Sequence, residues 1–140
     1  MEKLICIFFV LFIAISVCTA ADYTDNGDGT ISDNDTGLMW KMITDGPFIW
    51  EDALIHCENL NYAGYTDWRL PNINELRTLV DFEISKPAIE QEYFPGTLDR
   101  YWSSTTATGT PNNAWTLFFK YNGVWDHAGK LEHNSVRAVR

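Results

Sequence analysis

The stretch TDWRLPNINEL, residues 66–76, decides the fold, because it joins a short extended segment to the start of a helix. Residues 68–70 run into Pro71, and a proline restricts the residue before it to extended backbone. Asn72 and Glu75 then have the spacing of a capping box, in which the Asn side chain accepts from an early helical amide and the Glu side chain reaches back to the cap amide. We predict a helix over residues 73–81, with a buried stripe formed by Ile73, Leu76, Leu79 and Val80.

A second helix is predicted upstream, over residues 49–60. Apolar residues recur at helical spacing from Trp50 onward, which is typical of an amphipathic helix. Asp45 and Pro47 supply start signals ahead of it. Cys57 lies on the apolar face, so we expect a buried, inert thiol. The residues of this face are Trp50, Ala53, Leu54, Cys57 and Leu60.

Short strands are expected on either side of the two helices. The turn signals DNGDG and DNDTG separate strands near Tyr23 and at residues 30–32 and 38–41. Downstream, RYWSST, AWTLFF and KYNGVW are expected to be strands, and the Asn-Gly pair at Asn122 and Gly123 indicates a hairpin turn.

The last segment, SVRAVR, has Val136 and Val139 at its apolar positions, and Arg137 and Arg140 are candidates to pair with the acidic surface. Residues 82–99 show no sustained period and contain Pro87, Pro95 and Gly96, so a long irregular segment is expected there. The predicted fold class is therefore α+β, with two helices, a mostly antiparallel sheet and long irregular loops.

The first twenty residues have the pattern of a secretory signal. One lysine precedes an apolar run, and small residues lead to a cleavage site after Ala20. The apolar run, residues 4–17, is shorter than the roughly 20 residues that a spanning helix needs. We expect residues 1–20 to be removed and residues 21–140 to form a single domain that is secreted, periplasmic or on the cell surface, without membrane insertion. Lipidation at Cys18 is the alternative.

Charge and cysteine content exclude several classes of function. The net charge is −9 and stays so without residues 1–20, because Glu2 and Lys3 cancel. Such a surface repels nucleic acid and anionic lipid. Of the three cysteines, Cys6 and Cys18 fall in the predicted signal, so Cys57 has no partner for an internal disulfide.

The ordered series DGTISDNDTGLMW, WEDALIHCENL, GYTDWRLPNINEL, YWSST and VRAVR resembles the bacterial Lcl C-terminal domain, also called DUF1566. The resemblance covers essentially all of residues 21–140, and TDWRLPNINEL is its most specific piece. It implies a C-type-lectin-like fold, distantly related to the sulfatase-modifying-factor domain, on exported proteins. The founding member is a collagen-like adhesin whose C-terminal domain trimerises and binds sulfated glycosaminoglycans. The expected partners are therefore a glycan or a cell-surface protein, and a homotrimer is an expected assembly.

This chain departs from the family in two respects. Members commonly carry a cysteine in the last strand, placed to pair with the helix cysteine, and Ala138 stands there instead. The glycosaminoglycan binder also depends on a cationic surface, whereas this chain is acidic, so heparin-like ligands are not expected.

The resemblance implies that the ligand surface is built by the long loops before the last strands, here residues 105–113 and 123–134. Amide and carboxylate groups beside an exposed ring suit the hydroxyls and C–H faces of sugars. The alternative is that the tryptophan is a core residue and the polar groups are merely solvated. The candidate ligand-binding residues are Asn112, Asn113, Trp125, Asp126, His127, Glu132 and His133.

A calcium site is the alternative to turn chemistry in the Asp-rich residues 23–35. Asp25, Asp28 and Asp33 are the candidate ligands, since hard cations accept irregular oxygen cages. An EF-hand is not favoured, because aligning its loop glycine with Gly29 puts Thr24 at the first ligand position. Asp, Asn and Gly also suit tight turns, and this interpretation is preferred.

Catalysis is not expected. Ser103 and Ser104 have no nucleophile elbow around them, and His127 and His133 are six apart in a loop, which is weak support for zinc. We expect a non-catalytic binding module, without a cofactor, that recognises a glycan or surface protein as an adhesin does. The alternatives are a structural or oligomeric subunit of a surface assembly and, third, a metal-dependent hydrolase.

Overall fold

The computed structural model describes residues 21–97 and 100–140. The predicted signal peptide, residues 1–20, and Cys18 with it, lie outside the described residues. Within them, two helices and two sheets form, so the predicted α+β class is confirmed. None of the helices in this part of the chain has the length and apolar character that crossing a membrane requires.

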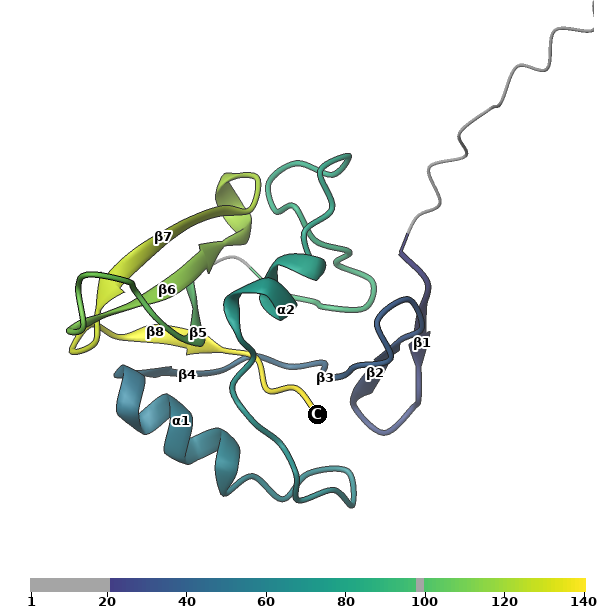
Figure 1. The fold of residues 1–140 in the computed structure, drawn as a ribbon. Helices are drawn as coiled ribbons and strands as arrows, with labels where there is room; N and C mark the ends of the chain where they lie inside the picture. The colour runs from purple at the N-terminus through teal and green to yellow at the C-terminus, as the bar shows by residue number, and fades with distance from the viewer. Residues whose placement is uncertain (1–20, 98–99) are drawn as a thin grey trace, which may run out of the picture.

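A five-stranded sheet forms the larger part of the fold (Figure 1). Its strand order is β4-β8-β5-β6-β7. Neighbouring strands are antiparallel except β5 and β8, which are parallel, so the sheet is mixed but mostly antiparallel. The strands are β4 (Asp45–Phe48), β5 (Arg100–Thr106), β6 (Asn113–Phe118), β7 (Val124–Gly129) and β8 (Asn134–Val136).

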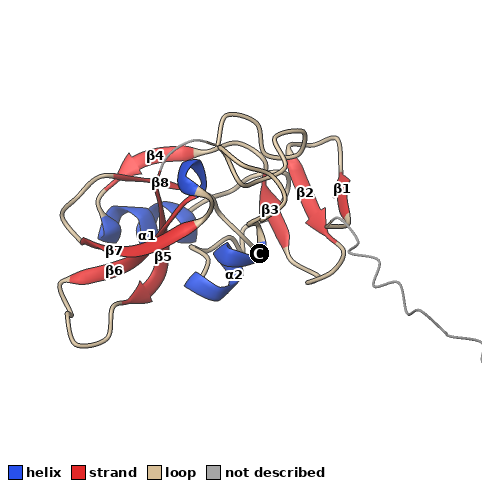
Figure 2. Cartoon of the chain, turned by 90° about the horizontal axis from the view of Figure 1, so that it is seen from above, coloured by secondary structure: helices blue, strands red, loops and turns tan. Residues whose placement is uncertain are grey.

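A smaller antiparallel sheet stands beside the larger one (Figure 2). It consists of β1 (Tyr23–Asp25), β2 (Thr30–Asp33) and β3 (Met39–Lys41), which confirms the three strands predicted between the Asp- and Gly-rich turns. The C-terminal residues join this sheet to the rest, since Val139 forms isolated bridges with Trp40 and with Arg69.

The helices α1 (Trp50–Glu58) and α2 (Ile73–Thr78) cover opposite faces of the large sheet. Tyr101 and Trp102 of β5 point to opposite faces, because side chains alternate along a strand. Tyr101 belongs to the buried cluster that contains Leu76 of α2, and Trp102 to the cluster that contains Ala53 and Cys57 of α1. The sheet is thus buried from both sides over β5 and the adjoining parts of its neighbours.

The capping box at α2 is confirmed. The Glu75 amide donates to Asn72 Oδ1 at 2.9 Å, and the Asn72 amide donates to Glu75 Oε2 at 2.8 Å. Arg69 donates to both Glu75 oxygens, at 2.8 and 2.7 Å. The helix ends at Thr78, earlier than predicted, because the Asp81 amide turns away to donate to the Ala88 carbonyl.

The start signals assigned to α1 are wrong. Asp45 and Pro47 belong to β4, a strand that the sequence does not predict. The Asp45 carboxylate lies 2.8 Å from Lys41 Nζ, with which it forms an ion pair, and 3.1 Å from His56 Nε2, so it does not cap the helix. The first helical amide, that of Trp50, donates to the carbonyl of residue 130 in the loop before β8.

Cys57 is buried and free, as predicted. Burial, with a smaller contribution from nearby carboxylates, raises the pKa of the Cys57 thiol to about 12. The thiol therefore stays protonated and unreactive at neutral pH.

Arg137 does not pair with the acidic surface, so this prediction is wrong. Its side chain is fully buried and donates to the carbonyls of Lys41 and Met42 and to the hydroxyls of Thr44 and Thr97. Burial lowers the pKa of the guanidinium from its ordinary value.

Arg140, by contrast, is correctly predicted to pair with an acid. Its Nε donates to Asp67 Oδ1 at 2.7 Å. This ion pair connects the last residue of the chain to the stretch that precedes α2.

The hairpin of β6 and β7 turns at Asn122 and Gly123, which both have positive φ, as the Asn-Gly pair predicts. Phe119, Lys120 and Tyr121, expected in strands, instead form a short 3-10 turn, η1 (Phe119–Tyr121). Residues 82–97, the described part of the expected irregular segment, contain no helix or strand.

Candidate functional site

The pairing of β6 with β7 gathers aromatic side chains on one face of the sheet. Trp115 lies opposite His127, and Leu117 lies opposite Trp125. Directly opposed residues of an antiparallel pair point to the same face, and so do residues two apart on one strand. Leu117 is buried towards α2, whereas Trp125 and His127 are exposed and Trp115 is partly exposed. We call Trp115, Trp125 and His127 the aromatic platform.

Trp115 lies between the other two rings of the platform. Its centroid is 5.2 Å from that of Trp125, with the planes tilted by 42°, and 5.7 Å from that of His127, at 72°. The Arg77 guanidinium of α2 lies 4.7 Å from the Trp125 centroid, within cation–π range. The platform is thus held in place by contacts on the sheet and from the helix above it.

Polar groups border the platform at His127. Asn113 Nδ2 lies 2.9 Å from His127 Nδ1. With the amide nitrogen donating, Nδ1 is the acceptor and Nε2 carries the proton of the neutral ring. His127 then offers an N–H donor, and the Asn113 carboxamide offers its oxygen as an acceptor, beside exposed indole rings.

The seven predicted site residues do not all lie together in the structure. Asn113, Trp125 and His127 come together at the platform. Asp126 alternates to the opposite face, and its Oδ1 accepts from the His127 amide at 2.7 Å. Asn112 lies in the loop before β6, where its carbonyl accepts from the Lys130 amide.

Glu132 and His133 lie between β7 and β8, away from the platform. Glu132 accepts from the Gly129 amide at 2.9 Å and pairs with Arg100 at 3.5 Å. His133 lines a pocket of about 400 Å³ together with Arg100 and Phe118. Phe118 points to the face opposite the platform, because it follows Leu117 on β6.

Trp125 is not a core residue, because 49% of its surface is exposed. Two other residues of this face, Trp115 and Arg77, are not predicted from the sequence. The position of Trp115 could have been inferred from the hairpin. Two strands paired about a turn at residues 119–123 place Trp115 opposite His127. Arg77 comes from α2, and its approach to Trp125 depends on helix packing that the sequence pattern does not specify.

The three carboxylates considered for calcium each hold a turn. Asp25 accepts from the Gly27 amide, and Asp33 accepts from the amides of residues 35 and 36. Asp28 accepts from the Thr30 hydroxyl at 2.6 Å and from the Thr30 amide, and the hydroxyl bond is the main reason why the pKa of Asp28 is lowered. These bonds are the Asx-type interactions that turns use.

Groups for metal or nucleophilic chemistry do not converge in the part of the chain that the structure describes. No three His, Cys, Asp or Glu residues there are placed to hold a metal ion. Ser103 is fully buried and donates to the Trp115 carbonyl at 2.7 Å, so its hydroxyl supports the platform strand.

Residues 29–140 match the family model of the Lcl C-terminal domain. The chain belongs to the Lcl C-terminal domain family. The matched residues include both helices and every strand of the large sheet, and therefore the whole aromatic platform. A search of the curated proteins finds no match.

In this member of the Lcl C-terminal domain family, Ala138 and Cys57 belong to the same buried cluster. Ala138 and Cys57 thus pack within one cluster, and Cys57 is free.

Proposed function

We propose that this protein is an exported, non-catalytic binding module that recognises a glycan in the manner of an adhesin. The observation that carries the proposal is the aromatic platform, in which two indole rings lie 5.2 Å apart beside a donor from His127 and an amide from Asn113. Indole faces pack against the C–H faces of sugar rings, and the polar groups bond their hydroxyls. The acidic net charge favours a neutral or cationic glycan over a sulfated one.

We also propose that the fold is C-type-lectin-like, as the family resemblance implies. Two helices on a mostly antiparallel sheet, with an irregular segment at residues 82–97, support this proposal. Export to the periplasm, the cell surface or the medium is proposed from residues 1–20, and mass spectrometry of the chain produced in an exporting host tests it. A mature chain that retains residues 1–20 would contradict it.

A glycan array tests the binding function. The exported chain is labelled and applied to neutral, amine-bearing and sulfated glycans, with and without EDTA. The proposal predicts binding to a subset of non-sulfated glycans, unchanged by EDTA, because the platform uses no metal. If a chain with a verified native fold binds no glycan in either condition, the glycan proposal is lost. If binding disappears with EDTA, calcium at the Asp-rich turns becomes the better explanation.

The second candidate is a structural or oligomeric subunit, and the edge of the large sheet favours it. Among the described strands, β7 pairs with β6 alone, so its outer backbone groups are free to pair with another chain. Val124 and Trp125 on this strand are both about half exposed. Light scattering on the purified protein measures its mass in solution: a trimer supports this candidate, and a monomer at all concentrations argues against it.

A further inference from the structure

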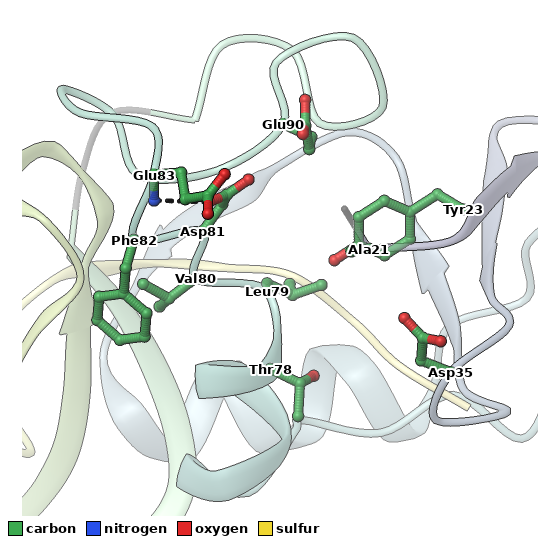
Figure 3. Close-up of a pocket in the computed structure, with 10 residues that line it drawn as sticks. All are labelled: Ala21, Tyr23, Asp35, Thr78, Leu79, Val80, Asp81, Phe82, Glu83 and Glu90. Carbon is green, nitrogen blue, oxygen red and sulfur yellow. Dashed lines mark hydrogen bonds between the residues drawn. The ribbon is translucent and has the colours of Figure 1, made fainter. Parts of the chain in front are cut away.

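A second pocket lies on the side of the molecule where α2 meets the small sheet, and carboxylates surround it (Figure 3). Its volume is about 390 Å³. The residues come from three parts of the chain: the start of the described residues with β1 and the turn after β2, the last residue of α2 with those that follow it, and the irregular segment. We call it the acidic pocket, and its four acids are Asp35, Asp81, Glu83 and Glu90.

These four carboxylates have no cationic partner among residues 21–97 and 100–140. The ion pairs found there use other acids. Two of the four accept from backbone amides, Asp35 from residue 22 at 3.2 Å and Asp81 from Glu83 at 2.8 Å. Because these carboxylates line one pocket without a neutralising side chain among the described residues, a cation placed in the pocket is attracted to them.

Besides the four carboxylates, the Tyr23 side chain also indicates that the acidic pocket can bind a ligand. Only 8% of its surface is exposed, and its ring packs at 5.3 Å against both Tyr93 and Phe94. Its hydroxyl has no hydrogen-bond partner within the described part of the chain, and in Figure 3 it points into the middle of the acidic pocket. The side chain is thus buried while its hydroxyl faces the acidic pocket without a partner among the described residues, so the hydroxyl is placed to bond a ligand there.

The surroundings keep this hydroxyl neutral. Burial, and then the negative charges of Asp33, Glu90, Asp35 and Asp81, raise the pKa of Tyr23 well above its ordinary value. The oxygen therefore retains its proton and can still accept a hydrogen bond from a cationic N–H. The same carboxylates that raise this pKa attract a cation.

The rest of the acidic pocket is apolar. Leu79 and Val80 form its floor next to Tyr23, and Phe82 stands at its edge with 80% of its surface exposed. A hydrated metal ion gains nothing from such a floor, and no three carboxylates here are placed to hold a bare metal ion within the described residues. An organic cation with an alkyl stem matches both parts of the lining.

We propose that the acidic pocket binds an alkylammonium or alkylguanidinium group. The stem lies on Leu79, Val80 and the Phe82 ring, and the cationic head donates to the carboxylates and to the Tyr23 oxygen. This site is separate from the aromatic platform and does not depend on glycan binding.

Two sources can supply such a head group. One is an external amine, either a free molecule or a basic side chain on a short peptide. The other is the chain itself: if cleavage follows Ala20 as the sequence predicts, Ala21 carries a free α-ammonium, and Ala21 lines the acidic pocket. The chemistry is the same, and the experiment distinguishes the sources.

The test is an NMR titration of the isotope-labelled chain, purified from an exporting host with its N-terminus identified by mass spectrometry. The probes are pentylammonium, N-butylguanidinium and, as an uncharged control, 1-pentanol. The proposal predicts saturable shifts of the amides of Asp35, Leu79 and Glu83 with the two cations, at least tenfold weaker with 1-pentanol. Equal shifts with 1-pentanol, or shifts spread over all acidic surfaces, would overturn it.

Amino-acid substitutions test whether the cation binds at the acidic pocket. D81N combined with E90Q removes two charges from the acidic pocket and is expected to weaken pentylammonium binding at least tenfold. Y23F removes only the hydroxyl and is expected to weaken it about threefold, the size of one hydrogen bond. D52N combined with E58Q removes the same charge from the exposed side of α1 and serves as the matched control, with less than a twofold change. If the control weakens binding as much as D81N with E90Q, binding reflects net charge and the site is refuted.

The internal source gives a different pattern. If the Ala21 ammonium occupies the acidic pocket, external cations bind weakly to the chain that begins at Ala21. The α-amine, made visible by ¹³C-methylation, then titrates above its ordinary range of about 7.7 to 8.0 and returns to it in D81N with E90Q. Either pattern supports an ammonium site. Absence of both external binding and a raised α-amine pKa overturns it.

Discussion

Arg137 shows how a single charged residue can organise the interior. It lies fully buried and joins the end of β3 and the residues after it to the segment before β5, through its bonds to Lys41, Met42, Thr44 and Thr97. A sequence pattern assigns an arginine to the surface, because buried arginines are rare. Its burial depends on carbonyls that become neighbours only in the folded chain, and this is why the sequence could not reveal it.

Replacing Arg137 therefore destabilises the protein. R137M keeps the volume but leaves two buried carbonyls without donors, and we expect a loss of about 3 to 5 kcal/mol in the free energy of unfolding. T97V removes one hydroxyl partner and should cost about 1 to 3 kcal/mol. R140A, which breaks an exposed ion pair, is the control and should change stability little. Urea denaturation measures all three, and an R137M variant as stable as the wild type contradicts this account.

Glu75 gives the fold a defined sensitivity to acid. The hydrogen bonds from Arg69, then the Asn72 amide, hold the pKa of the Glu75 carboxyl below its ordinary value of 4.5. Because the folded-state pKa is the lower one, the stabilisation is present above pH 4.5 and is lost as the pH falls through the folded value. E75Q keeps an acceptor for the Asn72 amide but removes the charge.

We expect E75Q to be less stable than the wild type at pH 7 and the difference to close below pH 4.5. Thermal unfolding at a series of pH values measures this difference. E58Q removes a carboxylate on the exposed side of α1 and is the matched control, with no such closing gap. A gap that is constant with pH would mean that the charge of Glu75 does not stabilise the fold.

At the scale of elements, the sequence predicts both helices and the small sheet because their signals are local. The capping box at Asn72 and Glu75 marks the start of α2, and the Asp-rich turns mark the ends of β1 and β2. β4 escapes prediction because Gly46 and Pro47 interrupt its pattern, and its pairing with β8 joins residues far apart in sequence. The platform also depends on how the strands pair. From the sequence, Trp125, His127 and the neighbouring Asn113 are predicted as site residues, whereas Trp115 is not.

The turn between β6 and β7 fixes that register, and Gly123 is the residue that permits it. Gly123 has a φ of +68°, and a side chain there would collide with Val80. Gly27 has a φ of +76° with no atom nearby. G27A should therefore lose about 1 to 2 kcal/mol for the left-handed backbone alone, and G123A at least about 1 kcal/mol more for the collision. Chemical denaturation measures the loss of stability in both variants. Equal losses would show that the Val80 side chain moves aside without destabilising the fold.

At the scale of the whole molecule, the free edge of β7 separates the two candidate functions. A lysine on an edge strand blocks pairing with another chain. If the protein is a trimer through this edge, V124K should convert it to a monomer, whereas L131K, at a more exposed loop residue, should not. Light scattering measures the mass of each variant. A trimer that survives V124K shows that the copies meet at another surface.

Isothermal titration with the glycan that binds best on the array is the sharpest measurement of whether the aromatic platform binds a glycan. W125A removes an exposed indole and should weaken binding at least tenfold, which is about 1.4 kcal/mol. Y121A removes a tyrosine of similar exposure, 57% against 49%, that packs on Phe118 outside the platform, and should bind like the wild type. If W125A binds as tightly as Y121A and the wild type, the platform is not the binding site.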